Sequence, residues 1–166
     1  MIGKKMLDAL NEQVNAEMYS GYLYLAMAAY FEDANLPGMA KWMTVQAQEE
    51  LGHAMKIYRF IVERNGRASF KAIAAPPAKW DSPLAAFQAA YDHERKVTGL
   101  IDDLVNLAAA QKDHASGVFL QWFVNEQVEE EATALAIVAK LKMIGDKPHG
   151  LLMLDHELGK REAGGD

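Results

Sequence analysis

The sequence predicts an all-α fold, a four-helix bundle with one long crossover and a short C-terminal fifth helix. Four long segments repeat apolar residues at helical spacing. The connection between the second and third, residues 66–80, is long and contains Pro76 and Pro77. An extended chain covers about 3.3 Å per residue, so this connection can span a bundle and let two helices run parallel. The alternative, a disordered linker between two hairpins, would leave each hairpin's apolar face exposed.

Start and stop signals place each helix along the chain. The first four are expected at residues 4–32, 38–64, 82–111 and 115–144, and the fifth at residues 150–160. Proline opens the second helix, Ser82 caps the third, and Asn65-Gly66 and Gly145 end the second and fourth. We therefore expect a single domain over residues 1–166, with the bundle at about 4–144 and a mobile tail at 161–166.

Composition narrows the class of protein. The chain has 166 residues, 51% of them hydrophobic and 24% charged, which suits one globular domain. The net charge of −6 and the lack of a basic stripe argue against nucleic acid as a partner. With no cysteine, disulfides, thiolate zinc sites and iron–sulfur clusters are excluded. Neither a signal peptide nor a run of about 20 apolar residues is evident, so we expect a cytoplasmic protein without a membrane partner.

Each predicted bundle helix carries polar residues in the middle of its apolar stripe. Burying a carboxylate without compensation costs several kcal/mol, and four carboxylates cannot all ionise in a dry site. Any one of them, taken alone, is also explained as a surface residue on a misphased stripe. Together they predict two metal ions at mid-bundle, and a mostly oxygen shell suits iron or manganese better than structural zinc. The expected ligands are Glu17, Glu50, His53, Glu94 and Glu130, with Gln127 beside them.

A second acidic group flanks the first on the second and fourth helices. Glu49, Glu126 and Glu129 either form a solvated acidic face or, with Glu130, a third and more exposed metal site. Two aromatic residues, Tyr24 and Trp122, are candidate electron donors for oxygen reduction, although filling the core is the simpler role for Trp122. The remaining histidines are expected at caps, turns or the tail and are assigned no role: His93, His114, His149 and His156.

Several motifs fall in register on the four helices: LNEQ at 10–13, AEMYS at 16–20, QEELGH at 48–53, DHE at 92–94, LQWF at 120–123 and EQVEEE at 126–131. Through them the chain resembles the prokaryotic non-haem ferritins over nearly its whole length. The resemblance implies a ferritin-like fold, a ferroxidase activity that uses Fe²⁺ with O₂ or peroxide, and a hollow shell of 24 identical subunits that stores ferric mineral. The fifth helix would contribute to contacts at a symmetry axis.

The resemblance also implies a role for each candidate residue. A first iron site would use Glu17, Glu50 and His53. A second would use Glu50 as a bridge, with Glu94 and Glu130. Gln127 would contact the second iron or the oxygen species, and Tyr24 would stand beside the centre. The third site would be built by four glutamates: Glu49, Glu126, Glu129 and Glu130.

Departures from related families narrow the expectation. Bacterioferritins carry a second Glu-x-x-His where this chain has Gln127-x-x-Glu130, and their haem-ligating methionine falls at Gly52, so no haem is implied. Rubrerythrins need cysteines, and mini-ferritins place their extra helix in the crossover. Two alternatives to the ferroxidase stay open: a storage or structural cage subunit with weak ferroxidase activity, and a di-metal oxygenase with an organic substrate, which needs a cavity beside the metals.

Overall fold

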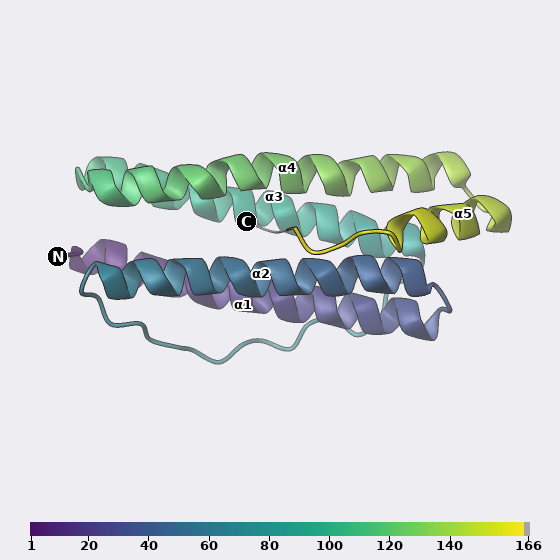
Figure 1. Cartoon of the computed structure of the whole chain (residues 1–166), viewed down its shortest axis with the longest axis horizontal. Coiled ribbons are helices and arrows are strands. Elements are labelled where there is room, and N and C mark those ends of the chain that lie inside the picture. Colours follow the sequence, from purple (N-terminus) through teal and green to yellow (C-terminus); the bar gives the residue numbers. More distant parts are fainter. Residues whose placement is uncertain (165–166) are drawn as a thin grey trace.

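A computed structural model describes residues 1–164, which form helices and no strand. The elements are α1 (Lys4–Asp33), α2 (Pro37–Glu63), α3 (Pro83–Ala110), α4 (His114–Ile144) and α5 (Pro148–Leu158). The long helices α1 to α4 lie along one another, the crossover follows the outside of the α1–α2 pair, and α5 packs at one end (Figure 1). The predicted all-α ferritin-like bundle with one long crossover and a short fifth helix is confirmed.

Local signals account for the helix ends. The Ser82 hydroxyl accepts from the Ala85 amide and caps α3, and the Asp113 carboxylate accepts from the Ser116 amide and caps α4. Because Asp113 is the cap, α4 begins at His114, one residue before the expected start. Asn65 has a left-handed φ of 55°, a conformation that asparagine tolerates better than most residues. The fifth helix was expected at residues 150–160. It begins at Pro148 and ends at Leu158, so both ends lie earlier in the sequence than expected.

The bundle interior has apolar ends and a polar middle. One apolar cluster includes Met27, Phe31, Met43 and Phe87, and the other includes Leu10, Val14, Ile57, Ile101 and Phe123. The glutamates expected to bind metal lie between these clusters along every helix. The apolar ends supply the burial that holds the helices together, since each buried aliphatic or aromatic side chain contributes about 1.5–3 kcal/mol. The polar middle therefore needs a different explanation.

The apolar stripe expected on the third helix contains Phe87, Tyr91, Glu94 and Thr98, and the buried face of α3 is rotated slightly from it. Tyr91 and Thr98 are half-buried, whereas Ala90 and Val97, one residue earlier in each case, are buried. Glu94 belongs to both faces and is buried as expected. The rotation turns Tyr91 and Thr98 toward a groove between α3 and α4.

The C-terminal segment is attached to α2. Asp155 of α5 accepts from the Met39 amide at 2.8 Å, near the positive N-terminal end of α2. Farther on, the Arg161 guanidinium pairs with Glu49 at 2.6 Å and lies 4.4 Å from the Trp42 ring centroid. Within the tail expected to be mobile, Arg161 and Gly164 donate to Glu49, while residues 165–166 lie outside the described residues. None of the helices in residues 1–164 is long and apolar enough to cross a membrane.

Candidate metal centre

Five expected ligands meet in the polar middle of the bundle. Their exposed fractions lie between 1% and 7%, and they come from all four long helices: Glu17, Glu50, His53, Glu94 and Glu130. Two trios have ligand atoms within 4.8 Å of one another, and both contain Glu50. One adds Glu17 and His53, and the other adds Glu94 and Glu130. Glu50 is therefore the carboxylate common to both trios.

Hydrogen bonds leave part of this cluster uncompensated. Gln13 Nε2 donates to Glu17 Oε1 at 2.8 Å, but Glu17 Oε2 is buried with no hydrogen-bond partner in residues 1–164. The Gln46 amide donates to Glu50 Oε1 at 3.0 Å and to Glu130 Oε2 at 2.7 Å. Buried carboxylate oxygens normally have partners, so an orphaned oxygen beside His53 fits a cation bound there. The donor set of oxygens with one imidazole suits iron or manganese.

The electrostatics lead to the same conclusion. Burial, and then the neighbouring carboxylates, raise the pKa values of Glu17 and Glu50 well above the usual range. Burial also raises the pKa of Glu94, and burial together with Glu94 raises the pKa of Glu130 to about 8. Without a counter-charge the cluster resists full ionisation at neutral pH, so a bound cation would stabilise it.

Two further expected residues contact Glu94. The Tyr24 hydroxyl donates to Glu94 Oε1, and Gln127 Nε2 donates to Glu94 Oε2 at 3.1 Å. Both donors are buried, so each oxygen of the carboxylate has a defined partner. Gln127 presents its nitrogen to Glu94, and through that atom it acts as a hydrogen-bond donor to a candidate ligand.

The structure overturns the placement of His93 at a cap, turn or tail. This residue lies within α3 beside Glu94, and its Nε2 is 2.7 Å from the Ser20 hydroxyl. Its ring packs against Tyr19 and Tyr24, with centroids 5.9 and 6.2 Å apart. Burial lowers the pKa of His93 to about 4, so the imidazole is neutral at physiological pH. No turn signal surrounds residue 93, and this alone would have placed it inside the helix.

The candidate third site is only partly assembled. Glu126 and Glu130 form a ligand trio with His53, whose Nε2 is 4.0 Å from Glu126 Oε1. Glu49 is instead paired with Arg161, and Glu129 is exposed and belongs to no such trio within the described chain. All four glutamates line one cleft of about 910 Å³, together with Trp122 and Arg161.

Trp122 does more than fill the core. It packs against the apolar cluster around Phe123, but it also lines the acidic cleft. Its ring meets the His53 ring edge-on with centroids 5.4 Å apart, and the Lys56 ammonium lies 3.5 Å from its ring centroid. The side chain therefore contacts His53 of the candidate centre and also lines the cleft.

A four-helix bundle whose helices each contribute a carboxylate to one buried cluster has the architecture of the ferritin-like carboxylate proteins. The family model for the ferritin-like domain matches residues 7–144. With that match, the chain belongs to the ferritin family, and the resemblance to prokaryotic non-haem ferritins is confirmed.

Relatives match the chain end to end. It is 48% identical to a "Bacterial non-heme ferritin" of Bacteroides fragilis, over 97% of this chain and 100% of that protein. A protein of the same description from Staphylococcus aureus is 39% identical, over 97% of each chain. Among solved structures, an open pore ferritin from the archaeon Archaeoglobus fulgidus is 55% identical with a TM-score of 0.97, over 98% of this chain and 100% of that one.

Proposed function

We propose that the chain is an iron-storage ferritin subunit that oxidises Fe²⁺ to Fe³⁺ at the mid-bundle centre and stores the ferric product as an oxo-hydroxide mineral. The observation that carries the proposal is Glu50, buried and shared by two trios of ligand atoms. Full-length similarity to bacterial non-heme ferritins supports the same function. Iron is here the substrate, two ions to a centre, and O₂ or peroxide is the electron acceptor.

The residues have distinct tasks in this reaction. Glu17 and His53 would hold one Fe²⁺, Glu94 and Glu130 the other, and Glu50 would bridge them. Carboxylate ligands favour the harder Fe³⁺ ion over Fe²⁺, which lowers the reduction potential and drives oxidation. Tyr24 and Gln127 orient Glu94 through hydrogen bonds. The apolar clusters close the bundle interior on both sides of the centre along the bundle axis.

The acidic cleft gives the product a way out. It begins at His53 and Glu130, which also belong to the centre, and continues past Glu126 to the exposed Glu129. Ligands that become steadily more exposed bind a cation more weakly, because water competes for it. We assign Glu126, Glu129 and Glu49 to a third, transient iron site along this path.

A cage of identical subunits completes the proposal. Archaeoglobus fulgidus has a ferritin of nearly the same chain fold. Large apolar side chains are exposed on the single chain, among them Val118 at 76%, Val128 at 68% and Phe70 at 66%. Such surface is typical of chains that bury it against copies of themselves. We propose 24 subunits and a cytoplasmic location, and size-exclusion chromatography tests the first, since elution as a monomer or dimer would contradict it.

Aerobic addition of Fe²⁺ tests the centre. We expect Glu50→Ala and His53→Ala to slow the rise of ferric absorbance by more than about tenfold, because each removes a ligand. The matched control is Glu63→Ala, which removes the same charge from an exposed position of the same helix. Oxidation at the parental rate in both ligand variants would contradict the assignment.

The di-metal oxygenase is the second candidate, because a groove of about 410 Å³ between α3 and α4 reaches Gln127 beside Glu94. Oxygen uptake distinguishes the two reactions. A ferroxidase consumes O₂ in proportion to the iron added and then stops. An oxygenase loaded with iron continues to consume O₂ as long as its organic substrate and an added electron donor last. The storage subunit with weak activity would take up mineral while oxidising Fe²⁺ no faster than the Glu50→Ala variant.

A further inference from the structure

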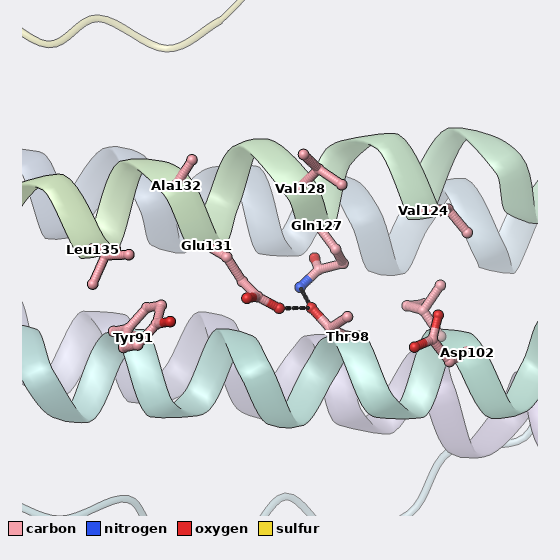
Figure 2. Close-up of a pocket in the computed structure, with 10 residues that line it drawn as sticks. Tyr91, Thr98, Asp102, Val124, Gln127, Val128, Glu131, Ala132 and Leu135 are labelled. Atoms are coloured by element: carbon pink, nitrogen blue, oxygen red, sulfur yellow. Dashed lines mark hydrogen bonds between the residues drawn. The ribbon is translucent and has the colours of Figure 1, made fainter.

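A chain of hydrogen bonds leads from the groove between α3 and α4 to the candidate centre. Gln127 Nε2 donates to Thr98 Oγ1 at 3.3 Å, and Thr98 Oγ1 donates to Glu131 Oε1 at 2.6 Å. Figure 2 shows Glu131 reaching from α4 toward Thr98 on α3, and the Gln127 nitrogen, also from α4, close to the same hydroxyl. Thr98 and Glu131 were not among the expected site residues, and neither belongs to a ligand trio of the described chain.

The chemistry of the amide, the hydroxyl and the carboxylate fixes which group donates in each of these hydrogen bonds. A threonine hydroxyl has a single proton, and a carboxylate can only accept. The Thr98 hydroxyl is 2.6 Å from the Glu131 carboxylate but 3.0 Å from the Glu94 backbone carbonyl, so the proton belongs on the Glu131 side. Thr98 then offers only lone pairs to Gln127. The amide must therefore turn its nitrogen, not its oxygen, toward α3.

The orientation of this amide matters for Glu94. The same nitrogen lies 3.1 Å from Glu94 Oε2 and 3.2 Å from the Glu94 carbonyl oxygen. If the amide turned over, its oxygen would face these two acceptors, and Glu94 Oε2 would lose its donor. Glu94 Oε1 is already held by Tyr24. The aim of the carboxylate thus depends on Gln127, and Thr98, whose proton goes to Glu131, is the acceptor outside Glu94 that holds the Gln127 amide in this orientation.

We propose that Thr98 and Glu131 are positioning residues for the second metal position: they fix the Gln127 amide and, through it, aim the Glu94 carboxylate at the position it shares with Glu50 and Glu130. This inference rests on the proposed function, since it assigns supporting residues to the same centre. Hydrogen-bond partners behind a metal ligand commonly change metal affinity by about 10–100-fold when removed.

Titration of the assembled, full-length protein with Co²⁺ tests the inference without any turnover, because the visible absorption of Co²⁺ reports its ligands. Thr98→Val removes the link, and Glu131→Ala removes its anchor. In each we expect the weaker of two Co²⁺ ions per subunit to bind about tenfold less tightly or worse, and the ion at Glu17 and His53 to bind as in the parent. Thr98→Ser keeps the hydroxyl and Glu131→Gln keeps an acceptor, so both should stay within about threefold of the parent.

The control is Asp102→Asn, which removes a carboxylate charge from the same groove and should leave both affinities unchanged. If it weakens binding as much as Glu131→Ala does, charge and not the hydrogen-bond chain is responsible, and the inference is wrong. Parental binding in Thr98→Val also overturns it while leaving the proposed function intact. If the parent itself fails to bind two Co²⁺ ions, both proposals fail. Should Thr98→Val not assemble, the difference between Glu131→Ala and Glu131→Gln decides the question.

Discussion

Glu94 has a donor on each carboxylate oxygen, although a metal ligand must also keep lone pairs for the ion. Tyr24 supplies one donor and Gln127 the other. A carboxylate oxygen accepts more than one partner, so these bonds leave room for a cation while limiting rotation of the group. The buried hydroxyl of Tyr24 keeps its proton and remains a donor, since burial and then Glu94 raise its pKa well above the usual range. At the scale of single residues, the centre is organised around this one carboxylate.

Tyr24→Phe removes one of these donors and keeps the ring. Glu94 Oε1 then lacks a partner in the metal-free protein, and a buried unsatisfied acceptor costs about 1–3 kcal/mol. We expect a lower thermal midpoint with chelator present and a smaller difference from the parent with Co²⁺, because the ion supplies the missing partner. Tyr58→Phe, on a half-buried tyrosine of α2, is the control. An equal loss with and without Co²⁺ would show that the hydroxyl serves packing alone.

Charged residues were the part of the centre that the sequence could predict. Burying a glutamate on an apolar stripe is costly in free energy, so a glutamate there is conspicuous. The helical spacing alone is therefore enough to select Glu17, Glu50 and Glu130. Two uncharged residues that support the centre, Gln46 and Thr98, were not selected in this way. Gln46 donates to Glu50 on its own helix and to Glu130 on α4, and Thr98 of α3 bonds two residues of α4. Such contacts depend on which helix faces meet.

At the scale of elements, α5 is tied to the start of α2 by close backbone packing. A Cβ atom added to Gly38 would lie 1.8 Å from the Asp155 carbonyl oxygen. Only glycine allows this approach, and the approach in turn brings the Asp155 carboxylate to the Met39 amide. The fifth helix is thereby an integral part of the chain fold.

Gly38→Ala should break this attachment. The methyl group has no space, and relieving such an overlap costs about 1–3 kcal/mol, in addition to the lost hydrogen bond from the Met39 amide to Asp155. We expect a lower thermal midpoint and faster amide hydrogen exchange in α5, measured by mass spectrometry. Gly99→Ala is the matched control, since a Cβ there meets nothing within 4 Å among the described residues and alanine favours the helix by about 1 kcal/mol. Equal exchange of α5 in Gly38→Ala and the parent would refute the attachment.

The number and order of the helices were predicted better than their buried faces and their terminal residues. Proline, glycine and cap residues act locally, so the helix starts at Pro37 and Pro83 follow from neighbouring residues alone. The face of α3 depends on how closely α1 and α4 approach it, and periodicity alone misjudged Tyr91 and Thr98. The contacts of residues 161–164 depend on where α5 ends relative to Glu49, which no local signal records.

For the whole molecule, the polar middle makes stability depend on pH and on metal. The pKa of Glu130 is about 8 in the folded chain, against about 4.3 for an ordinary glutamate. Between these values the folded state keeps a proton that the unfolded state has released, so stability falls as pH rises. His93 makes stability rise with pH, but only below about pH 6.5, because its folded pKa is about 4 and an ordinary histidine titrates near 6.5.

Between pH 6.5 and 8, the pH dependence of stability therefore reports the buried carboxylates and not His93. With a chelator present, we expect the thermal midpoint to fall across this range, since each group with a raised pKa removes up to about 1.4 kcal/mol of stability per pH unit. With Co²⁺ in excess the slope should vanish, because the ion replaces the protons as the counter-charge of Glu17, Glu50, Glu94 and Glu130. Glu130→Gln, which cannot ionise, should flatten the metal-free slope in part. A metal-free midpoint that stays level or rises from pH 6.5 to 8 would mean that these carboxylates are already compensated by the protein itself, and the case for cations at mid-bundle would lose its electrostatic basis.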